Sequence, residues 1–308
     1  MPPIEKLIAD FDGTVSEVDT LGLLVQNAAK HRATAGEVGA QTSFLEWRET
    51  VEWYSKQHAR IVNEWLTNDS GGTPGTEDKL EVHPDLAGLR RFLDAAEVLE
   101  YDATHRVIER KFLSGLTKET LQKIGRNVQL RSGVFTLMEA MRAIGVKIEI
   151  LSANWSKTFI QGAMGDMCDQ IVTNSLVFDK SGRSTGDIHL RVISAQDKLK
   201  HFLKRKSTGN HFTPSQHVKE QNHTLQPQKG RTLYIGDSVT DLLAILEADV
   251  GVLIGTKQTA VQAMKRFGIP TRTITGKDRF DSVRDAACTV LHVDSWETLG
   301  RFLEYDKS

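Results

Sequence analysis

Residues 7 to 14 read Leu7-Ile8-Ala9-Asp10-Phe11-Asp12-Gly13-Thr14, a short apolar run that ends in two aspartates and a glycine. Such a run beside turn-forming residues is typical of a buried strand, and the glycine permits the sharp turn that follows it. Taken alone, an Asp-rich turn that only caps a strand would explain the same fragment. The stretch predicts a first buried strand whose end presents the carboxylates of Asp10 and Asp12.

The rest of the chain divides into two regions by its hydrophobic pattern. Between Ser16 and Gln129, apolar residues recur at helical spacing and no strand signal stands out. Beyond this segment, helices alternate with short apolar runs, which indicates a parallel sheet covered by helices on both faces. The expected strands are 146–151, 231–235, 250–254 and 272–274, and the expected helices cover 134–144 and the residues after 241.

This pattern predicts an α/β fold with two domains. We expect a doubly wound parallel sheet, formed by residues 1–15 and 130–308, as the core. A smaller all-helical domain, residues 16–129, is expected to be inserted after the first strand as a cap.

Two segments of the second region depart from the alternation. Between Val172 and Leu190, two β-like runs flank the polar residues 179–183, which predicts a protruding hairpin. Residues 206–230 are polar and lack apolar periodicity, so we expect a flexible surface loop within the core. Its histidines match no compact metal-ligand spacing: His211, His217 and His223.

Composition excludes several classes of protein. The 308 residues carry 39 basic and 40 acidic side chains, a net charge of −1, which argues against a dedicated nucleic-acid surface. No apolar run approaches the ~20 residues that span a bilayer, and no secretory signal pattern is present. The cysteines, Cys168 and Cys288, lie far apart, which fits a reducing compartment. We expect a soluble cytoplasmic protein, whose oligomeric state the sequence leaves open.

Polar residues that suit an anion follow the predicted strand 146–151. Ser152 can donate its hydroxyl to a phosphoryl oxygen, while the backbone N–H groups of Ala153 and Asn154 point at the same anion. A helix N-cap would explain Ser152 equally well. Lys198, at the start of a later helix, can neutralise phosphate charge, although most lysines on a helix are simply solvated.

The predicted strand 231–235 is followed by two acids four residues apart. Asp237 comes directly after the strand, and Asp241 lies one turn into the next helix. Open α/β sheets bind ligands at the carboxyl ends of their strands, so these acids are expected to meet Asp10 and Asp12 there. Carboxylates suit Mg²⁺, and a carboxylate can also accept a phosphoryl group while a second acid transfers protons.

In these four motifs, taken in order, the chain resembles the haloacid dehalogenase (HAD) superfamily. The resemblance implies a magnesium-dependent phosphatase acting on a small phosphorylated metabolite, because Asp12 is the acid that the dehalogenases of the superfamily lack. It implies Asp10 as nucleophile, Asp12 as general acid/base, Ser152, Ala153, Asn154 and Lys198 as phosphate-binding residues, and Asp10, Asp12, Asp237 and Asp241 at the metal. It also implies a helical cap that closes over the substrate.

A closer similarity involves residues 234–249 together with Asn154-Trp155 and Asp197-Lys198-Leu199. These segments are similar to the phosphatase domain of plant thiamin monophosphate phosphatases and their fungal relatives, which implies thiamin monophosphate as substrate. Similar overall designs act on phosphoserine and pyrimidine nucleotides. A phosphotransferase with the same nucleophile is also open, and so is a non-catalytic relative that binds a phosphorylated metabolite, although such a relative would normally have lost one of the motif residues.

Several residues of the helical insert have two interpretations. Four aromatic side chains are more readily explained as the insert's own core than as a wall against a heterocyclic substrate: Trp47, Trp53, Tyr54 and Trp65. Glu17 and Asp19 lie where the chain leaves for the insert. They can meet a cationic part of the substrate or form a solvated hinge, and the hinge is the simpler explanation.

Overall fold

The computed structural model describes residues 4–34, 36, 40–67, 84–206, 230–279 and 289–304. The predicted surface loop, with its three histidines, and Cys288 lie outside the described residues. Among the described helices, none is long and apolar enough to cross a membrane.

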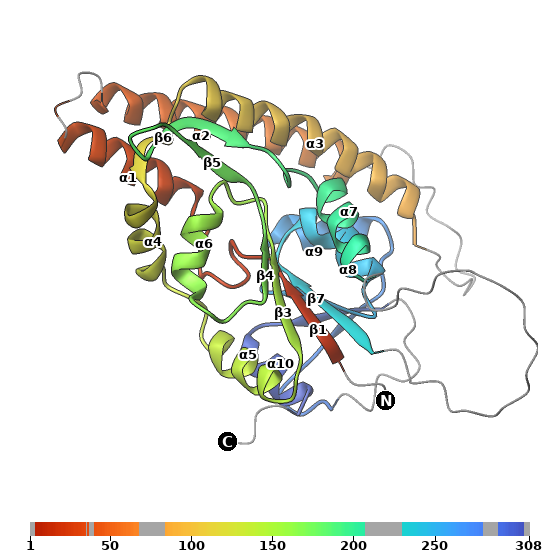
Figure 1. Cartoon of the computed structure of the whole chain (residues 1–308). Helices are drawn as coiled ribbons and strands as arrows, with labels where there is room; N and C mark the ends of the chain where they lie inside the picture. The colour runs from red at the N-terminus through yellow and green to blue at the C-terminus, as the bar shows by residue number, and fades with distance from the viewer. Residues whose placement is uncertain are drawn as a thin grey trace, which may run out of the picture.

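A seven-stranded sheet forms the centre of the molecule, with the strand order β4-β3-β1-β7-β8-β10-β9. Every neighbouring pair in it is parallel. The strands are β1 (Ile4–Ala9), β3 (Lys147–Leu151), β4 (Gln170–Val172), β7 (Arg231–Gly236), β8 (Val250–Ile254), β9 (Thr271–Thr273) and β10 (Val290–Val293). The expected parallel sheet is confirmed, with β1 between β3 and β7 (Figure 1).

Helices cover both faces of this sheet because its strands are apolar on both sides. The adjacent residues Leu7 and Ile8 of β1 belong to different apolar clusters. The cluster around Leu7 includes residues of α5 (Val134–Ala143), α6 (Lys157–Met164) and α10 (Trp296–Phe302). The cluster around Ile8 includes residues of α7 (Ala195–Lys206), α8 (Leu242–Glu247) and α9 (Gln258–Arg266). The two groups of helices lie on opposite sides of the sheet (Figure 1).

The chain leaves the sheet after β1 and returns to it at a neighbouring point. Ser16 pairs with Leu130 in an isolated antiparallel bridge, and Glu17 N–H donates to the carbonyl of Gln129 at 3.0 Å. Between these points the chain forms α1 (Leu21–Thr34), α2 (Ala40–Val62), the π-helix η1 (Asn63–Thr67), α3 (Leu86–Glu109), β2 (Ser114–Thr117) and α4 (Lys118–Arg126). The long helices α2 and α3 pack together across one end of the molecule (Figure 1).

The insert is not made of helices alone, which corrects the expectation of an all-helical insert. β2 pairs antiparallel with β6 (Arg183–His189), which also pairs with β5 (Ser175–Phe178). The β5-β6 pair is the predicted hairpin, and β2 makes it a three-stranded sheet. Only Leu116 of the four residues of β2 is buried, so the segment lacks the alternation that marks a strand in sequence. β4 and β10, with three and four residues, were also not predicted.

Candidate active site

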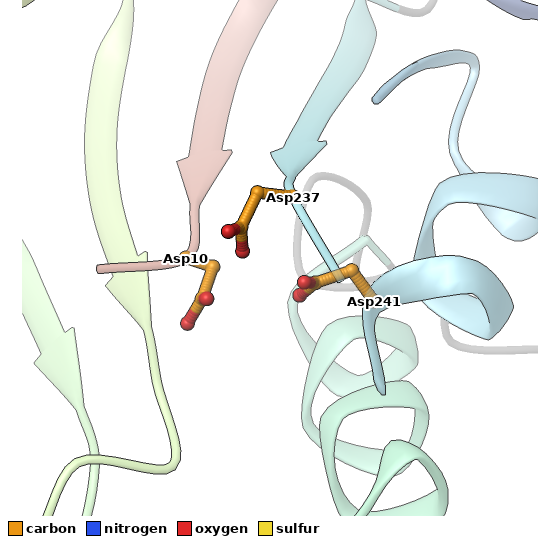
Figure 2. Close-up of side chains that lie close together, drawn as sticks. All are labelled: Asp10, Asp237 and Asp241. Carbon is orange, nitrogen blue, oxygen red and sulfur yellow. The ribbon is translucent and has the colours of Figure 1, made fainter. Parts of the chain in front are cut away.

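The acidic motif residues meet beyond the carboxyl ends of β1 and β7. Asp10, Asp237 and Asp241 each offer a carboxylate oxygen within 4.8 Å of the others. Figure 2 shows the three side chains together beyond the arrowheads of the two strands. All three are buried, with exposed fractions of 4%, 2% and 0%. Residues 227 positions apart in sequence are therefore brought together by the parallel pairing of β1 with β7, as expected.

The loop after β1 is held from several directions. Asp10 N–H donates to the carbonyl of Ile235 on β7 at 2.9 Å. Gly13 has a positive φ of 76°, and a Cβ there would lie 2.2 Å from Asp237 Oδ2. Arg131 Nε donates to the Gly13 carbonyl at 2.8 Å. Gly13 is therefore required both for its backbone conformation and for the close approach of Asp237.

Lys198 lies between two of the buried aspartates. Its ammonium is 3.1 Å from Asp10 Oδ1 and 2.7 Å from Asp241 Oδ1, and its side chain is 2% exposed. Burial disfavours this charge, but the two carboxylates outweigh it and raise the pKa of Lys198, so the lysine stays charged. Burial, with further contributions from neighbouring carboxylates, raises the pKa of Asp10 well above its ordinary value, although Lys198 opposes that shift.

Asp241 is fully engaged by hydrogen bonds. Its Oδ1 accepts from Lys198 and, at 2.8 Å, from the Tyr234 hydroxyl, while its Oδ2 accepts from the backbone and the hydroxyl of Ser238 at 3.1 and 2.9 Å. Against the effect of burial, Lys198 and these hydrogen bonds hold the pKa of Asp241 below its ordinary value. Gly236 makes room for it, since a Cβ there would lie 2.2 Å from Asp241 Cγ. Asp241 is thus a buried anchor for Lys198, and its lowered pKa favours the ionised carboxylate.

Asp237 is bound by a second lysine that the sequence did not single out. Its Oδ2 is 2.7 Å from the ammonium of Lys257, in the loop after β8, and its Oδ1 accepts from the Thr14 hydroxyl at 3.3 Å. Burial raises the pKa of Asp237, and Lys257 opposes this shift. Lys257 was missed because a lone lysine at the start of a helix carries no pattern that separates it from a solvated one.

Asp12 follows Asp10 by two residues. Its carboxylate is held by Thr20 of the insert and by Asn154 in the loop after β3. Its Oδ1 accepts from the backbone and hydroxyl of Thr20 at 2.8 and 2.5 Å. Its Oδ2 accepts from the Asn154 side-chain amide at 2.8 Å. Burial, followed by the nearby Asp19, raises the pKa of Asp12 to about 6. The carboxyl therefore exists in both protonation states near neutral pH, as a group that donates and later accepts a proton requires.

The residues after β3 form a tight buried turn. Ser152 Oγ accepts from Asn154 N–H at 3.0 Å, so its own hydrogen is free to be donated elsewhere. The sequence-based prediction gave the backbone N–H of Asn154 a contact with phosphate; in this structure that N–H donates to Ser152 Oγ, and the side-chain amide binds Asp12 and Thr20. Asn174, which the sequence did not single out, donates to the carbonyls of Ala153 and Asn154 at 3.0 and 3.2 Å.

Asn174 also reaches the segment that leads to Lys198. Its amide donates to the carbonyl of Val192 at 2.7 Å, and its Oδ1 accepts from the N–H groups of Arg191 and Val192 at 2.6 and 3.0 Å. A single buried side chain therefore ties the turn after β3 to the start of α7. A lone Asn beyond a short strand gives no sequence signal for this role.

Helix α3 contacts the start of α7 directly. The Ser194 hydroxyl donates to Glu97 at 2.8 Å, and the Tyr101 hydroxyl donates to Asp197 at 3.4 Å. Ser194 and Asp197 also form a reciprocal pair of hydrogen bonds at the start of α7. Asp197 N–H donates to Ser194 Oγ at 3.2 Å, and Ser194 N–H donates to Asp197 Oδ2 at 3.5 Å. The insert is thus attached to the helix that presents Lys198.

A second group of insert side chains lies between α2 and α3. The Tyr54 hydroxyl donates to Glu100 Oε1 at 2.6 Å. Asp19 is near enough to contribute to the raised pKa values of Asp12, Tyr54 and Glu100, and Lys198 lies near enough to oppose the shift of Glu100. Burial is the main cause of the shift for all three groups. We call Asp19, Tyr54 and Glu100 the acidic rim.

The other aromatic residues of the insert serve mainly as packing groups. Trp47 makes edge contacts with Phe112 and Trp155, at centroid distances of 5.7 and 6.3 Å. The guanidinium of Arg106 lies 3.8 Å from the centre of the Trp53 ring. These contacts favour the core interpretation over a wall against the substrate, whereas Tyr54 belongs to the acidic rim.

The donor set fits a magnesium ion. Mg²⁺ prefers oxygen ligands, and the buried group offers three carboxylates. The pKa values of Asp10 and Asp237 are raised by burial and by neighbouring carboxylates, so a divalent cation would relieve a real electrostatic cost.

Comparisons with known proteins agree with this architecture. No protein-family model matches the chain. In sequence it is 27% identical over 274 residues to the mitochondrial bifunctional TH2 protein of Arabidopsis thaliana, a match that covers 85% of this chain and 41% of the plant protein. It is 24% identical over 273 residues to cold tolerance protein 1 of Saccharomyces cerevisiae, covering 80% of this chain and 78% of the yeast protein.

Among solved structures, a HAD family hydrolase from Salmonella enterica serovar Typhi superposes with a TM-score of 0.50 at 16% identity, covering 85% of this chain and 66% of that one. This likeness concerns the fold: with its parallel sheet and the helical insert after β1, the chain has the same fold as this HAD family hydrolase. Its curated relatives include the plant TH2 protein and the fungal cold tolerance protein, and the chain spans less than half of the plant protein.

Proposed function

We propose that this chain is a Mg²⁺-dependent phosphomonoester hydrolase that acts on a small phosphorylated metabolite through an aspartyl-phosphate on Asp10. The observation that carries the proposal is the buried group Asp10, Asp237 and Asp241, with Lys198 between two of its members. A carboxylate nucleophile, a fixed cation and a titratable neighbour at one sheet edge are the components that phosphoryl transfer needs.

In the first half-reaction, an oxygen of Asp10 attacks phosphorus, and the bond from phosphorus to the leaving oxygen breaks. Asp12, protonated in part because its pKa is about 6, gives its proton to the leaving oxygen, so an alcohol departs. Thr20 and Asn154 hold the Asp12 carboxyl in place for this transfer.

In the second half-reaction, the ionised Asp12 takes a proton from a water molecule whose oxygen attacks the phosphorus of the intermediate. The bond between phosphorus and Asp10 breaks, and inorganic phosphate and the free carboxylate result. Lys198, 3.1 Å from Asp10 Oδ1, offsets the negative charge that develops on the phosphoryl oxygens in both steps. Ser152 Oγ and the backbone N–H of Ala153 bind the same oxygens.

Asp10, Asp237 and the backbone carbonyl of Asp12 are the groups that we propose to hold the magnesium ion. When bound, the ion supplies charge neutralisation between the carboxylates and the phosphate. Asp241 supports the site from behind through Lys198, because its own oxygens are already engaged.

For the substrate we propose thiamin monophosphate, with residues 16–129 as the cap that closes over it. The acidic rim supports a substrate with a cationic group, since Asp19 and Glu100 lie near Asp12 and Lys198. Thiamin carries a fixed positive charge on its thiazolium ring. The similarity to the plant TH2 protein points the same way.

The test is phosphate release by the purified chain across a panel of phosphomonoesters, with Mg²⁺ and with excess chelator. The panel comprises thiamin monophosphate, phosphoserine, pyrimidine nucleotides and p-nitrophenyl phosphate. We expect release that requires Mg²⁺, with kcat/KM above ~10⁴ M⁻¹s⁻¹ for thiamin monophosphate.

The Asp10→Asn variant is the matched control, because it keeps the shape of the nucleophile and removes its charge. Its turnover is expected to fall by a factor of at least ~10⁴. Turnover that survives this change would remove the proposed mechanism. Efficient release from a different panel member would keep the phosphatase and replace the substrate, and no release from any of them by the folded wild type would refute the proposed hydrolase.

A further inference from the structure

In the described part of the chain, two lysines contact the buried aspartates, and they differ sharply in their surroundings. Lys198 has a 2% exposed side chain and touches both Asp10 and Asp241. Lys257 has a 50% exposed side chain and makes one ion pair, with Asp237 Oδ2 at 2.7 Å. The buried lysine is fixed by two partners, whereas the other can leave its partner for solvent without losing a packed position.

The backbone of Lys257 is well placed even though its side chain is half exposed. The residue is the N-cap of α9, and its carbonyl accepts from Ala260 N–H at 3.1 Å. Its ammonium also lies against the loop after β1, 3.2 Å from where a Cβ on Gly13 would be. A four-carbon side chain anchored here reaches both Asp237 and the space beside Gly13.

Asp237 cannot serve a divalent cation fully while this ion pair persists. One of its oxygens is held by the Thr14 hydroxyl at 3.3 Å, and the other by the ammonium of Lys257. A hydroxyl can be shared with a cation, but an ammonium repels one. The contact between Lys257 and Asp237 is therefore the one that must yield when the carboxylate binds a metal ion.

We propose that Lys257 is an exchanging cation, which neutralises Asp237 in the metal-free protein and moves to the phosphoryl oxygens of a bound ligand once a divalent cation takes the carboxylate. The inference rests in part on the proposed function, because it assumes the same metal and phosphate site. An ammonium binds phosphate as a point charge on a flexible stem, so such a move needs no change of the backbone.

The exchange predicts opposite effects of one substitution on two ligands. Lys257→Met keeps the apolar stem and removes the competing charge, so we expect Mn²⁺ to bind with a dissociation constant about 10-fold lower than in the wild type. In saturating Mg²⁺, inorganic phosphate is expected to bind about 10-fold more weakly. Both constants are measured on the full chain without turnover, by electron paramagnetic resonance for Mn²⁺ and by calorimetry for phosphate.

Two variants make the comparison specific. Lys265→Met removes an exposed lysine from the same helix and is expected to leave both constants unchanged. Lys257→Arg keeps the charge and is expected to stay within about 3-fold of the wild type for both ligands. A purely structural Lys257 would give equal or weaker Mn²⁺ binding, and phosphate affinity unchanged by Lys257→Met would equally overturn the proposal. Failure of the proposed hydrolase appears separately, as absent phosphate release by the wild type.

Discussion

The carboxyl edge of the sheet and the helices that face it are built in different ways. At the edge, most of the functional side chains are buried, and Asp241 and Asn174 are each held by two or more partners. On α2 and α3, the facing residues Tyr54 and Glu100 are partly exposed and bind mainly each other. The edge is therefore rigid and specific in its chemistry, while the helical face can change without disturbing it.

This difference separates catalysis from substrate choice. The groups that act on phosphorus are placed by the ends of the strands and by α7, which are fixed by packing in the two apolar clusters. The groups near the rest of the substrate lie on helix surfaces, where a single substitution alters charge but not the fold. Changes at the edge should affect every substrate equally, whereas changes on the helical face should affect only some.

The largest effect is expected at Lys198, the most enclosed charge of the edge. Lys198→Met leaves Asp10 and Asp241 without their shared cation, and we expect turnover to fall by about 10³-fold on all substrates, about 4 kcal/mol of transition-state stabilisation. Steady-state assays on thiamin monophosphate and p-nitrophenyl phosphate measure it. The melting temperature should fall as well, because an unpaired buried carboxylate is destabilising.

Lys200→Met is the matched control, since Lys200 lies on the same helix with an exposed side chain. It is expected to keep wild-type activity and stability. Adding Asp241→Asn to Lys198→Met should recover part of the lost stability but no activity. A double variant as active as the wild type would show that Lys198 is only a structural counter-ion.

The second prediction tests whether helix α4 packs as part of the core, although it lies within the inserted residues. Helix α4 packs closely on α6, one of the helices that cover the sheet. A Cβ on Gly125 of α4 would be 2.1 Å from the carbonyl oxygen of Phe159 in α6. Gly125→Ala should lower the free energy of unfolding by about 2–3 kcal/mol, measured by denaturant titration. Gly22→Ala, in α1 with no atom within 4 Å, should be neutral or stabilise by up to about 1 kcal/mol.

A loss of similar size at both glycines would mean that the contact of Gly125 with α6 does not decide the result. No loss at Gly125 would mean that the packing of α4 on α6 is easily rearranged. Helix α4 would then belong with the helical face rather than with the core. The expected outcome places the physical border of the core before α4, while the chain crosses into the insert at Ser16 and returns at Leu130.

The sheet and the positions of the acidic residues could be predicted from sequence because their signals are local. An apolar run followed directly by an acid marks both Asp10 and Asp237, and the rule that ligands bind at strand ends brings them together. Because the pattern occurs at two distant points of the chain, it predicts a shared site more specifically than either fragment alone. Asp12, Lys198 and Asp241 were also singled out from the sequence, and their roles followed from the resemblance to one superfamily.

The rest depends on tertiary contacts that leave no local trace. Lys257 and Asn174 act through partners more than 15 positions away, and nothing near them in sequence marks them. The side-chain amide of Asn154 binds Asp12, and this contact also joins residues that are far apart in the sequence. β2 pairs with a distant strand through only a few residues, so its formation is decided by β6 rather than by its own composition.

The smallest effect is expected on the helical face, at Glu100. Glu100→Gln keeps an oxygen that accepts the Tyr54 hydrogen bond and removes the negative charge. We expect KM for thiamin monophosphate to rise about 10-fold, which corresponds to about 1.4 kcal/mol, while KM for p-nitrophenyl phosphate changes less than about 2-fold. Glu109→Gln, at an exposed position of the same helix, is the control and should change neither constant.

The pH dependence of this selectivity gives the sharper test of the comparison. Burial, with a contribution from Asp19, raises the pKa of Glu100 above its ordinary value, so Glu100 loses its charge at a higher pH than an exposed glutamate would. Selectivity of the wild type for the cationic substrate should therefore fall as the pH drops through that raised pKa, and the Gln variant should show no such fall. Equal losses on both substrates would place Glu100 with the edge rather than with the helical face, and the separation of catalysis from substrate choice would not hold at this residue.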